Sequence, residues 1–309
     1  MEKLSKIYIA GHKGLVGSAI MRILRAKGFE NLLFATSSEL DLRNQEATER
    51  FFNIQRPEYV FLAAARVGGI KANMSYPAQF AYDNLQIQNN VIHFSWKFGV
   101  KKLFFFGSNC IYPKDCRQPM QEGDLLTGAP EPTNEAYAVA KLAGIELCRA
   151  YRHQYGSNFI TAITASQFGP NDNFSSESSH LVPALIRRFH EARISGKEKV
   201  TLWGSGTPRR ELMHVDDLAE ASIFLMYHYN SPDVINIGVG RNFTIQDISD
   251  LIKRVVRYTD IIDWDTTKPD GIPRKLLDSS RINLLGWRPN VSLEEGLKQT
   301  YEWFVKNIR

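Results

Sequence analysis

The chain has 309 residues, of which 43% are hydrophobic and 23% are charged, enough to bury one large core or two unequal ones. Its three cysteines show no paired CxxC spacing, which argues against a disulfide scaffold and a zinc site and favours a reducing compartment. The net charge of +5 suits an anionic partner, but the basic residues are scattered, which favours a small phosphorylated ligand over nucleic acid.

Over the first half of the chain, short apolar runs alternate with amphipathic stretches of helix length. The predicted strands are 6–10, 31–36, 59–65, 102–106 and 159–165. The predicted helices are 15–27, 45–55, 77–98 and 134–155. Such alternation predicts an α/β fold with a Rossmann-type doubly wound parallel sheet, covered by helices on both faces.

After about residue 165 the alternation becomes less regular. We expect helices at 181–193, 216–228, 245–258 and 293–307, and strands at 200–203 and 234–237. The sequence therefore predicts a dinucleotide-binding domain over residues 1–165, with returning segments from about 200–240. Residues 166–309 would form mainly a smaller, mixed α/β substrate-binding domain.

A glycine-rich loop separates the first predicted strand from the first predicted helix. Glycines at this place permit a tight turn, close approach of the backbone to a pyrophosphate and close packing of the helix on the strand. The position of the trio between strand and helix distinguishes it from glycines of an ordinary turn. The candidate cofactor-binding residues of this loop are Gly11, His12, Lys13, Gly14, Leu15, Val16 and Gly17.

The end of the second predicted strand indicates which dinucleotide binds. An NAD site would place an acid there for the ribose 2′-hydroxyl, but Ala35 and Ser37 are uncharged and Glu39 lies further on. Lys13 could reach a 2′-phosphate, so the sequence favours NADP. Asp41 is a candidate acceptor for the adenine amino group, with a solvated or capping acid as the alternative.

Tyr137 and Lys141 stand one helical turn apart, on one face of the fourth predicted helix. A nearby cation favours the phenolate and would lower the pKa of the tyrosine from about 10. Such a tyrosine can pass a proton to a carbonyl oxygen while hydride arrives at the carbon. A Tyr–Lys pair also arises by chance, but here Ser108 ends an intervening strand and the glycine loop lies upstream.

These residues resemble an extended short-chain dehydrogenase/reductase that acts on nucleotide sugars. Longer motifs are similar to those of the GDP-L-fucose synthase family, from about Ile7 to the last helix. They are the segments 63–70 (AAARVGGI), 107–113 (GSNCIYP), 131–135 (EPTNE), 169–174 (GPNDNF), 203–208 (WGSGTP) and 268–271 (KPDG). The resemblance implies epimerisation of GDP-4-keto-6-deoxy-D-mannose at C3 and C5, followed by reduction at C4 with NADPH.

Epimerisation needs an acid and a base, because a C4 ketone acidifies the protons on C3 and C5. The resemblance assigns the base to Cys110 and the acid to His180, beside Ser108, Tyr137 and Lys141 as the reductase group. An inert buried thiol is the alternative for Cys110, and a capping or surface histidine is the alternative for His180. A dehydratase of the superfamily would show Thr-Asp-Glu where this chain has Ser108-Asn109-Cys110.

The resemblance also implies binding residues and a partner. For the GDP-sugar they are Arg188, Trp203, Arg210 and Asp278, and for the cofactor Lys141, Thr164, Ser166, Gln167 and His180. The family usually shows Pro-Thr-Asn where this chain has Thr164-Ala165-Ser166, which puts some contacts there in doubt. Two long helices, 77–98 and 134–155, would pair across a twofold axis in a homodimer.

The remaining expectations are absences and alternatives. No long apolar run and no basic-then-apolar leader is present, so we expect a soluble, unprocessed, cytoplasmic protein without a membrane partner. We also expect no metal and no nucleic-acid partner. The alternatives are an epimerase-reductase for a related GDP-4-keto-deoxysugar, similar to colitose synthase, and a non-catalytic NADP-binding protein on the same fold.

Overall fold

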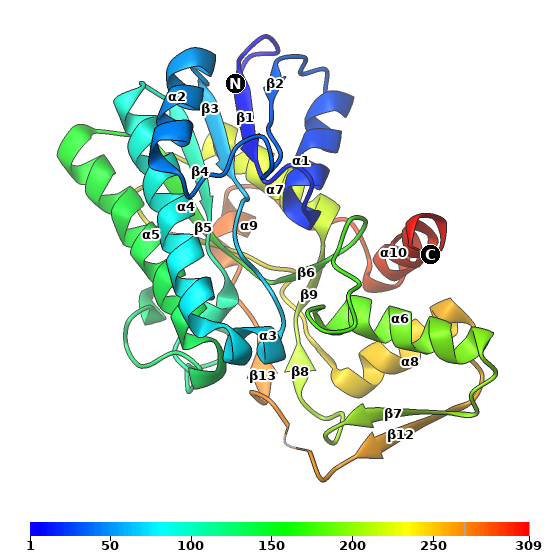
Figure 1. The fold of residues 1–309 in the computed structure, drawn as a ribbon. Coiled ribbons are helices and arrows are strands. Elements are labelled where there is room, and N and C mark those ends of the chain that lie inside the picture. The colour runs from blue at the N-terminus through cyan, green and yellow to red at the C-terminus, as the bar shows by residue number, and fades with distance from the viewer. Residues whose placement is uncertain (269, 309) are drawn as a thin grey trace.

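The computed structural model describes residues 1–268 and 270–308, so Pro269 of the predicted KPDG motif lies outside the described residues. Its main sheet has six strands in the order β10-β5-β4-β3-β1-β2, and all neighbouring strands are parallel (Figure 1). The strands are β1 (Ile7–Ala10), β2 (Leu32–Leu33), β3 (Tyr59–Leu62), β4 (Lys102–Phe106), β5 (Phe159–Thr164) and β10 (Ile235–Ile237). The predicted doubly wound parallel sheet is confirmed.

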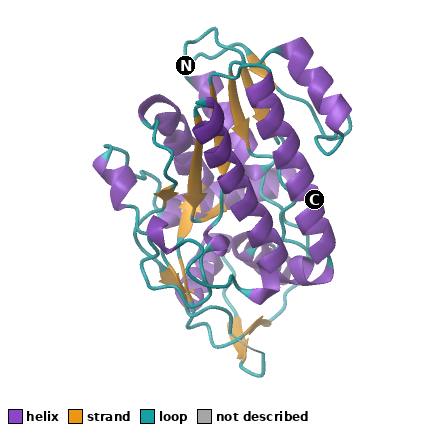
Figure 2. Ribbon diagram, turned by 90° about the vertical axis from the view of Figure 1, so that its left-hand side faces the viewer, coloured by secondary structure: helices purple, strands orange, loops and turns teal. Residues whose placement is uncertain are grey.

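Two helical layers cover this sheet. The helices are α1 (Leu15–Ala26), α2 (Gln45–Gln55), α4 (Pro77–Lys97), α5 (Glu135–Tyr155) and α7 (Val215–His228). α1 packs on α7, whereas α4 packs between α2 and α5, and the long α4 and α5 run side by side (Figures 1 and 2). Local signals set the helix ends: Asn44 caps α2 by accepting from the Ala47 N–H, and Gly156 ends α5 with a φ of +70°.

A second hydrophobic core lies below the sheet. It is built by α6 (Leu181–Ile194), α8 (Ile245–Val256) and α10 (Leu293–Asn307), packed against the parallel pair β7 (Lys199–Trp203) and β12 (Ile261–Asp265). Short strands join this core to the sheet. They are β6 (Ser166–Phe168) paired with β9 (Leu212–His214), and β8 (Arg209–Arg210) between β11 (Phe243–Thr244) and β13 (Arg274–Lys275).

Three later segments return to the first core. α7 packs on α1 and β10 pairs with β5, within the range expected to return. Leu277, Ile282 and Trp287 also belong to the first core, and α9 (Ser280–Leu284) contacts β10. The predicted boundary at residue 165 did not include this last crossing, so the division into domains stays a prediction.

Several elements differ from those expected. The second strand covers two residues instead of six, because the Glu39 carboxylate accepts from the N–H and hydroxyl of Thr36 and folds the chain into a turn. α3 (Ile70–Ser75) and the 3₁₀ helices η1 (Asn109–Ile111), η2 (Glu122–Asp124) and η3 (Pro132–Asn134) were not predicted. Each is too short to show a hydrophobic period.

Candidate active site

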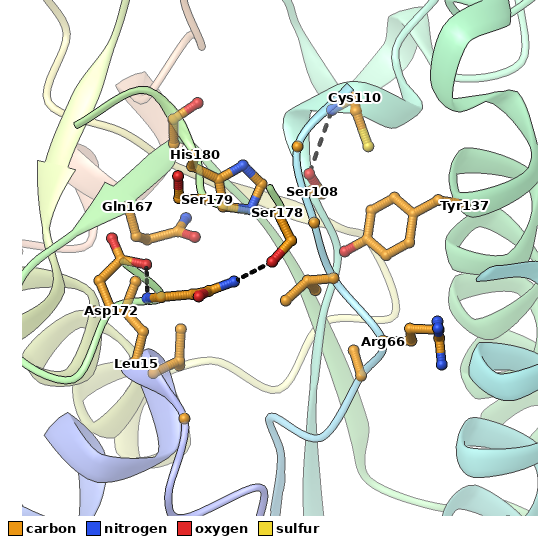
Figure 3. Close-up of a pocket in the computed structure, with 18 of the residues that line it drawn as sticks. Leu15, Arg66, Ser108, Cys110, Tyr137, Gln167, Asp172, Ser178, Ser179 and His180 are labelled. Atoms are coloured by element: carbon orange, nitrogen blue, oxygen red, sulfur yellow. Dashed lines mark hydrogen bonds between the residues drawn. The ribbon is translucent and has the colours of Figure 1, made fainter. Parts of the chain in front are cut away.

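A cavity of about 1110 Å³ opens at the carboxyl ends of the sheet strands, between the two cores. One side is formed by Arg66, Ser108, Cys110 and Tyr137, from the loops after β3 and β4 and from α5; Gln167, Asp172 and His180 lie on the opposite side (Figure 3). Ligands of open α/β sheets bind at this edge. The cavity is therefore the place where the predicted cofactor and substrate residues should meet.

The glycine loop forms the end of the cavity near β1. Gly11 has a φ of +84°, and a Cβ there would lie 2.8 Å from backbone atoms of Ala64. A Cβ on Gly17 would lie 2.2 Å from the Gly11 carbonyl oxygen, so α1 packs directly on the turn. Gly14 is the N-cap residue of α1, so no capping side chain covers the first N–H groups of this helix. The residues Gly14, Leu15, Val16 and Gly17 line the cavity. This cradle of backbone N–H groups fits the pyrophosphate of a dinucleotide.

Two predicted residues of this loop lie elsewhere. The His12 ring is buried against Phe34, with ring centroids 4.8 Å apart, and burial lowers its pKa. Lys13 is exposed. Neither residue lines the cavity, in contrast to the other five residues of the loop. The assignment of these two side chains to the cofactor therefore stays a prediction, with His12 packed under Phe34 and Lys13 at the surface.

The wall beyond the glycine loop suits the adenosine half of a dinucleotide. Ala35, Ser37, Asp41 and Arg43 line it, whereas Glu39 is turned toward Thr36. The Arg43 guanidinium holds the pKa of Asp41 below its ordinary value by hydrogen bonding. Arg43 was not singled out from the sequence, where it is one scattered basic residue among many.

Ser108 and Cys110 follow β4 on the wall of the cavity (Figure 3). The chain does not stay extended there: η1 begins after Ser108, whose side chain accepts from the Cys110 N–H at 3.5 Å. Cys110 is only 7% exposed but still lines the cavity, so the turn brings the thiol and the hydroxyl to one place. The cap of η1 is therefore what pairs the two side chains.

Opposing effects act on the Cys110 thiol. Burial raises its pKa, and the charges of Lys275 and Lys141 together with the Ser108 hydrogen bond lower it. Lys275 lies on β13 and lines the cavity, and burial lowers its own pKa. The sequence does not identify Lys275 as a neighbour of the thiol, because it is more than 160 positions away in a segment without a strong pattern.

Tyr137 and Lys141 line the cavity on α5. The Lys141 ammonium donates to the Phe106 carbonyl at 2.9 Å and lies 6.0 Å from the Tyr137 ring centroid. Burial lowers the pKa of Lys141 to about 8. Burial also raises the pKa of Tyr137, which is opposite to the shift expected from the sequence. The protein alone therefore keeps the phenol protonated, as a proton donor requires.

His180 faces these groups from the other wall. Figure 3 shows its ring and the Tyr137 hydroxyl directed into the space between them, with the Cys110 sulfur above. His180 is the N-cap residue of α6 but makes no side-chain capping bond; its side chain is exposed at the cavity, and partial desolvation there lowers its pKa. The capping alternative is therefore not what the structure shows.

The predicted substrate residues separate into two groups. Arg188, Trp203 and Arg210 line the cavity beside α6 and β8. The Trp203 ring is 71% exposed, and Arg210 donates to the Ile272 carbonyl at 2.7 Å. Asp278 does not line the cavity; its carboxylate accepts from the Gln121 side chain and the Ser280 N–H. The assignment of Asp278 to the substrate therefore stays a prediction.

The predicted cofactor residues after β5 also reach the cavity. Thr164, Ser166 and Gln167 line it, with the Thr164 hydroxyl 3.3 Å from the Gly107 carbonyl. Asp172 stands nearby with one carboxylate oxygen that has no hydrogen-bond partner, and burial raises its pKa to about 7. Asp172 belongs to the segment 169–174 noted in the sequence, but nothing in the sequence indicates a role for its carboxylate.

The described part of the chain contains neither a cluster of metal ligands nor a helix that could span a membrane. Residues 1–268 and 270–308 contain no group of three His, Cys, Asp or Glu side chains placed to hold a metal ion. In the same residues, no helix combines the length and the apolar character that crossing a membrane requires.

The fold and the site define a nucleotide-dependent enzyme of the extended short-chain dehydrogenase/reductase class. Residues 7–238 match the NAD dependent epimerase/dehydratase family, and the chain belongs to that family. Within it, the chain is 55% identical to GDP-L-fucose synthase 1 of Arabidopsis thaliana over 99% of this chain and 95% of the relative. The chain thus falls among the GDP-L-fucose synthases.

Solved structures agree with this placement. A GDP-6-OMe-4-keto-L-xylo-heptose reductase from C. jejuni superimposes with a TM-score of 0.94 at 38% identity, covering 99% of each chain. A GDP-L-fucose synthetase from Naegleria fowleri bound to NADP gives 0.92 at 29% identity, covering 99% of this chain and 96% of the other. Both matches extend over both cores of this chain.

Proposed function

We propose that the protein converts GDP-4-keto-6-deoxy-D-mannose to GDP-L-fucose, by epimerisation at C3 and C5 and reduction at C4 with NADPH. The observation that carries the proposal is the meeting of two groups in one cavity. Ser108, Tyr137 and Lys141 suit a reductase, and Cys110 and His180 suit an epimerase (Figure 3). The similarity to GDP-L-fucose synthases, and to a synthetase bound to NADP, supports the substrate class and the cofactor.

Epimerisation uses the two walls of the cavity. Cys110 takes a proton from C3 or C5 on one face of the sugar, and His180 returns one on the opposite face. Lys275 and Lys141 stabilise the thiolate against the effect of burial. A histidine with a lowered pKa is a stronger acid in its protonated form, so it gives its proton readily to the sugar carbon.

Reduction uses the groups at the end of β4 and on α5. The chemistry that NADPH supplies when bound is a hydride for the C4 carbon. The Tyr137 phenol donates a proton to the C4 oxygen, and its raised pKa keeps that proton in place until the transfer. The Ser108 hydroxyl accepts from the Cys110 N–H, and its own proton can hold the C4 oxygen. Lys141 keeps its position through the Phe106 carbonyl.

Binding of the two nucleotides is assigned to opposite ends of the cavity. The glycine loop, with Asp41 at the adenosine wall, would hold NADPH, and Ser166, Gln167 and His180 would border its reactive end. Arg188 and Arg210 suit the diphosphate of the GDP-sugar, because guanidinium groups bind phosphate in a bidentate manner. The exposed Trp203 ring offers a flat apolar surface to the same ligand.

The quaternary state is also a proposal. α4 and α5 pack together and present exposed apolar side chains, among them Tyr82 and Val139, which are 61% and 51% exposed. We infer a homodimer in which these helices pair across a twofold axis; a monomeric mass by light scattering at micromolar protein would contradict it. We also infer a cytoplasmic location, which free Cys110, Cys116 and Cys148 suit.

One experiment tests the proposed function. The enzyme is incubated with GDP-4-keto-6-deoxy-D-mannose and NADPH, and the product is identified by NMR. We expect GDP-L-fucose. A 4-reduced sugar with unchanged C3 and C5 would show a reductase without epimerase activity, and no turnover would favour a non-catalytic NADP-binding protein.

A further inference from the structure

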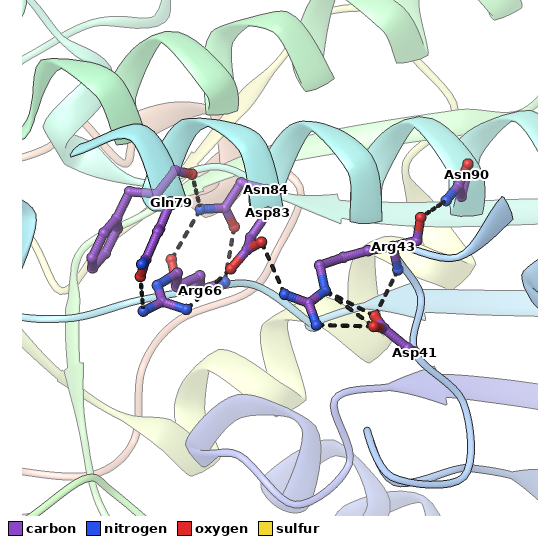
Figure 4. A network of polar contacts seen from close by, with 8 residues as sticks. Asp41, Arg43, Arg66, Gln79, Asp83, Asn84 and Asn90 are labelled. Atoms are coloured by element: carbon purple, nitrogen blue, oxygen red, sulfur yellow. Dashed lines mark hydrogen bonds and ion pairs between the residues drawn. The ribbon is translucent and has the colours of Figure 1, made fainter. Parts of the chain in front are cut away.

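At the adenosine wall of the cavity, one guanidinium connects two carboxylates. Arg43 Nε and Nη2 donate to the two oxygens of Asp41 at 3.0 and 2.9 Å (Figure 4). Arg43 Nη1 donates to Asp83 at 3.1 Å, and the second Asp83 oxygen accepts from Arg66 Nη1 at 3.0 Å. All four side chains line the cavity, with Asp83 at the centre of the chain of contacts.

Asp83 belongs to a polar stripe on α4 that holds the two loops of this wall. Asn84 exchanges two hydrogen bonds with the backbone of Arg66, at 2.9 and 3.0 Å. Asn90 donates to the carbonyls of Leu42 and Arg43, at 2.8 and 3.1 Å. α4 therefore fixes the backbone beside Arg43 while Asp83 fixes its guanidinium, so this arginine is held from two directions (Figure 4).

The Arg43–Asp41 half of this network contributes little to stability. Asp83 is only 7% exposed, whereas Arg43 and Asp41 are about half exposed at their side chains. Exposed ion pairs contribute little to stability, typically about 0–1 kcal/mol. Such contacts can contribute more to ligand affinity. A carboxylate that is already oriented toward the ligand does not have to be ordered when the ligand binds.

We propose that Asp83 is a positioning residue for adenine recognition: it holds Arg43, Arg43 holds the Asp41 carboxylate, and Asp41 accepts from the 6-amino group of the cofactor's adenine. The inference rests on the proposed function only in that the cofactor is an adenine dinucleotide. Asp41 has room for this bond, since two carboxylate oxygens offer about four acceptor positions. Three N–H donors of Arg43 (the backbone, Nε and Nη2) occupy three of them, with Nε shared between the two oxygens at 3.0 and 3.2 Å.

The test compares NADP⁺ with its hypoxanthine analogue, which carries a carbonyl oxygen in place of the 6-amino group. Binding to the full-length protein is measured by calorimetry, without turnover. Wild type should bind NADP⁺ about tenfold more tightly, the value of one hydrogen bond to a charged acceptor. Asp83→Asn should reduce this ratio to about threefold or less, and Asp83→Glu, which keeps the charge, should restore most of it.

Asp124→Asn is a matched control, because Asp124 is similarly buried and also accepts from a guanidinium, that of Arg117, but does not line the cavity. Its ratio should equal that of wild type. In an Asp41→Asn background, Asp83→Asn should change the ratio no further, because the two residues act in series. If Asp83→Asn does not fold, Arg43→Gln removes the same link from the exposed side.

Kinetics separate positioning from a general structural role. Asp83→Asn should raise the KM for NADPH about threefold to tenfold with kcat changed less than about twofold. The inference would be overturned if Asp83→Asn kept the full wild-type preference for NADP⁺ over the hypoxanthine analogue. It would also be overturned if the substitution weakened the binding of both nucleotides equally. Equal binding of both nucleotides by wild type would also overturn it, while the product identified by NMR would still decide the proposed function separately.

Discussion

Two acids share the cavity, and their surroundings treat them differently. Burial raises the pKa of both Tyr137 and Cys110. No cation offsets this effect for Tyr137, although Lys141 lies one turn away. For Cys110, two lysines and the Ser108 hydroxyl offset it in part. The difference matches the two roles, because reduction needs a group that still carries its proton and epimerisation needs a group that can lose it.

The sequence alone predicts the wrong direction for the pKa shift of Tyr137. Spacing on a helix correctly placed Lys141 near Tyr137, but spacing does not show how much water each group retains. The Lys141 ammonium is buried and bound to the Phe106 carbonyl, so it acts at a distance and with its own pKa lowered to about 8. Desolvation is the larger effect in the protein without bound nucleotides.

The largest expected effect comes from the tyrosine side of the comparison. Tyr137→Phe removes the phenolic proton and keeps the ring, so reduction should slow by about 10²–10⁴-fold. NADPH binding, measured by fluorescence titration, should change little. NADPH oxidation near the wild-type rate would mean that another group donates the proton. The contrast between Tyr137 and Cys110 would then not explain their roles.

Titration offers the next largest effect. Because burial raises the pKa of Cys110, its thiolate fraction should rise about tenfold per pH unit up to that pKa. Hydrogen–deuterium exchange at C3, followed by NMR from pH 6 to 9, should therefore increase with pH. Exchange that is flat across this range would mean that the base is not a thiol of raised pKa. Proton donation by Tyr137 should not decline over the same range, since its pKa is also raised.

A third prediction concerns the cation beside the thiol. Lys275→Met removes the charge that lowers the pKa of Cys110 most, and a shift of about one unit would reduce exchange at neutral pH about tenfold. Reduction of a substrate that is already epimerised should be affected less, because Tyr137 does not depend on Lys275. A matched loss in both reactions would indicate that Lys275 binds substrate rather than favouring the thiolate.

The smallest effect tests the cofactor end. With no acid at the end of β2, NADPH should give a higher kcat/KM than NADH. Lys13→Ala should narrow that preference by only a few-fold, because Lys13 is exposed and lies outside the cavity lining. Preference of the wild type for NADH would show that the strand end was misinterpreted.

How much of the molecule could be predicted from the sequence depends on the range of the signal. The parallel sheet was predictable because β1, β4 and β5 are buried, mainly apolar runs that alternate with helices. The glycine loop and the Tyr137–Lys141 pair were predictable because their geometry is local. Segments such as β8 and β13 have two residues each, too few to show alternation, and they bring Arg210 and Lys275 to the cavity.

The burial and direction of individual side chains account for the remaining differences between the predicted site and the structure. The sequence shows that His12 and Lys13 belong to the glycine loop, but only the fold shows that Phe34 covers the His12 ring. Asp278 lies close in sequence to Lys275, yet the two side chains point to different places, one to Gln121 and one to the cavity. Side-chain direction after a two-residue strand has no signature in one sequence.

The central claim is that Cys110 is the epimerisation base, and deuterium exchange tests it most directly. Wild type, incubated with GDP-4-keto-6-deoxy-D-mannose in D₂O without NADPH, should incorporate deuterium at C3 and C5. Cys110→Ser keeps the shape but lacks an acidic thiol, so it should not exchange, yet should slowly oxidise NADPH to give the unepimerised sugar. His180→Gln should retain exchange without completing epimerisation. Exchange by Cys110→Ser at the wild-type rate would contradict the account.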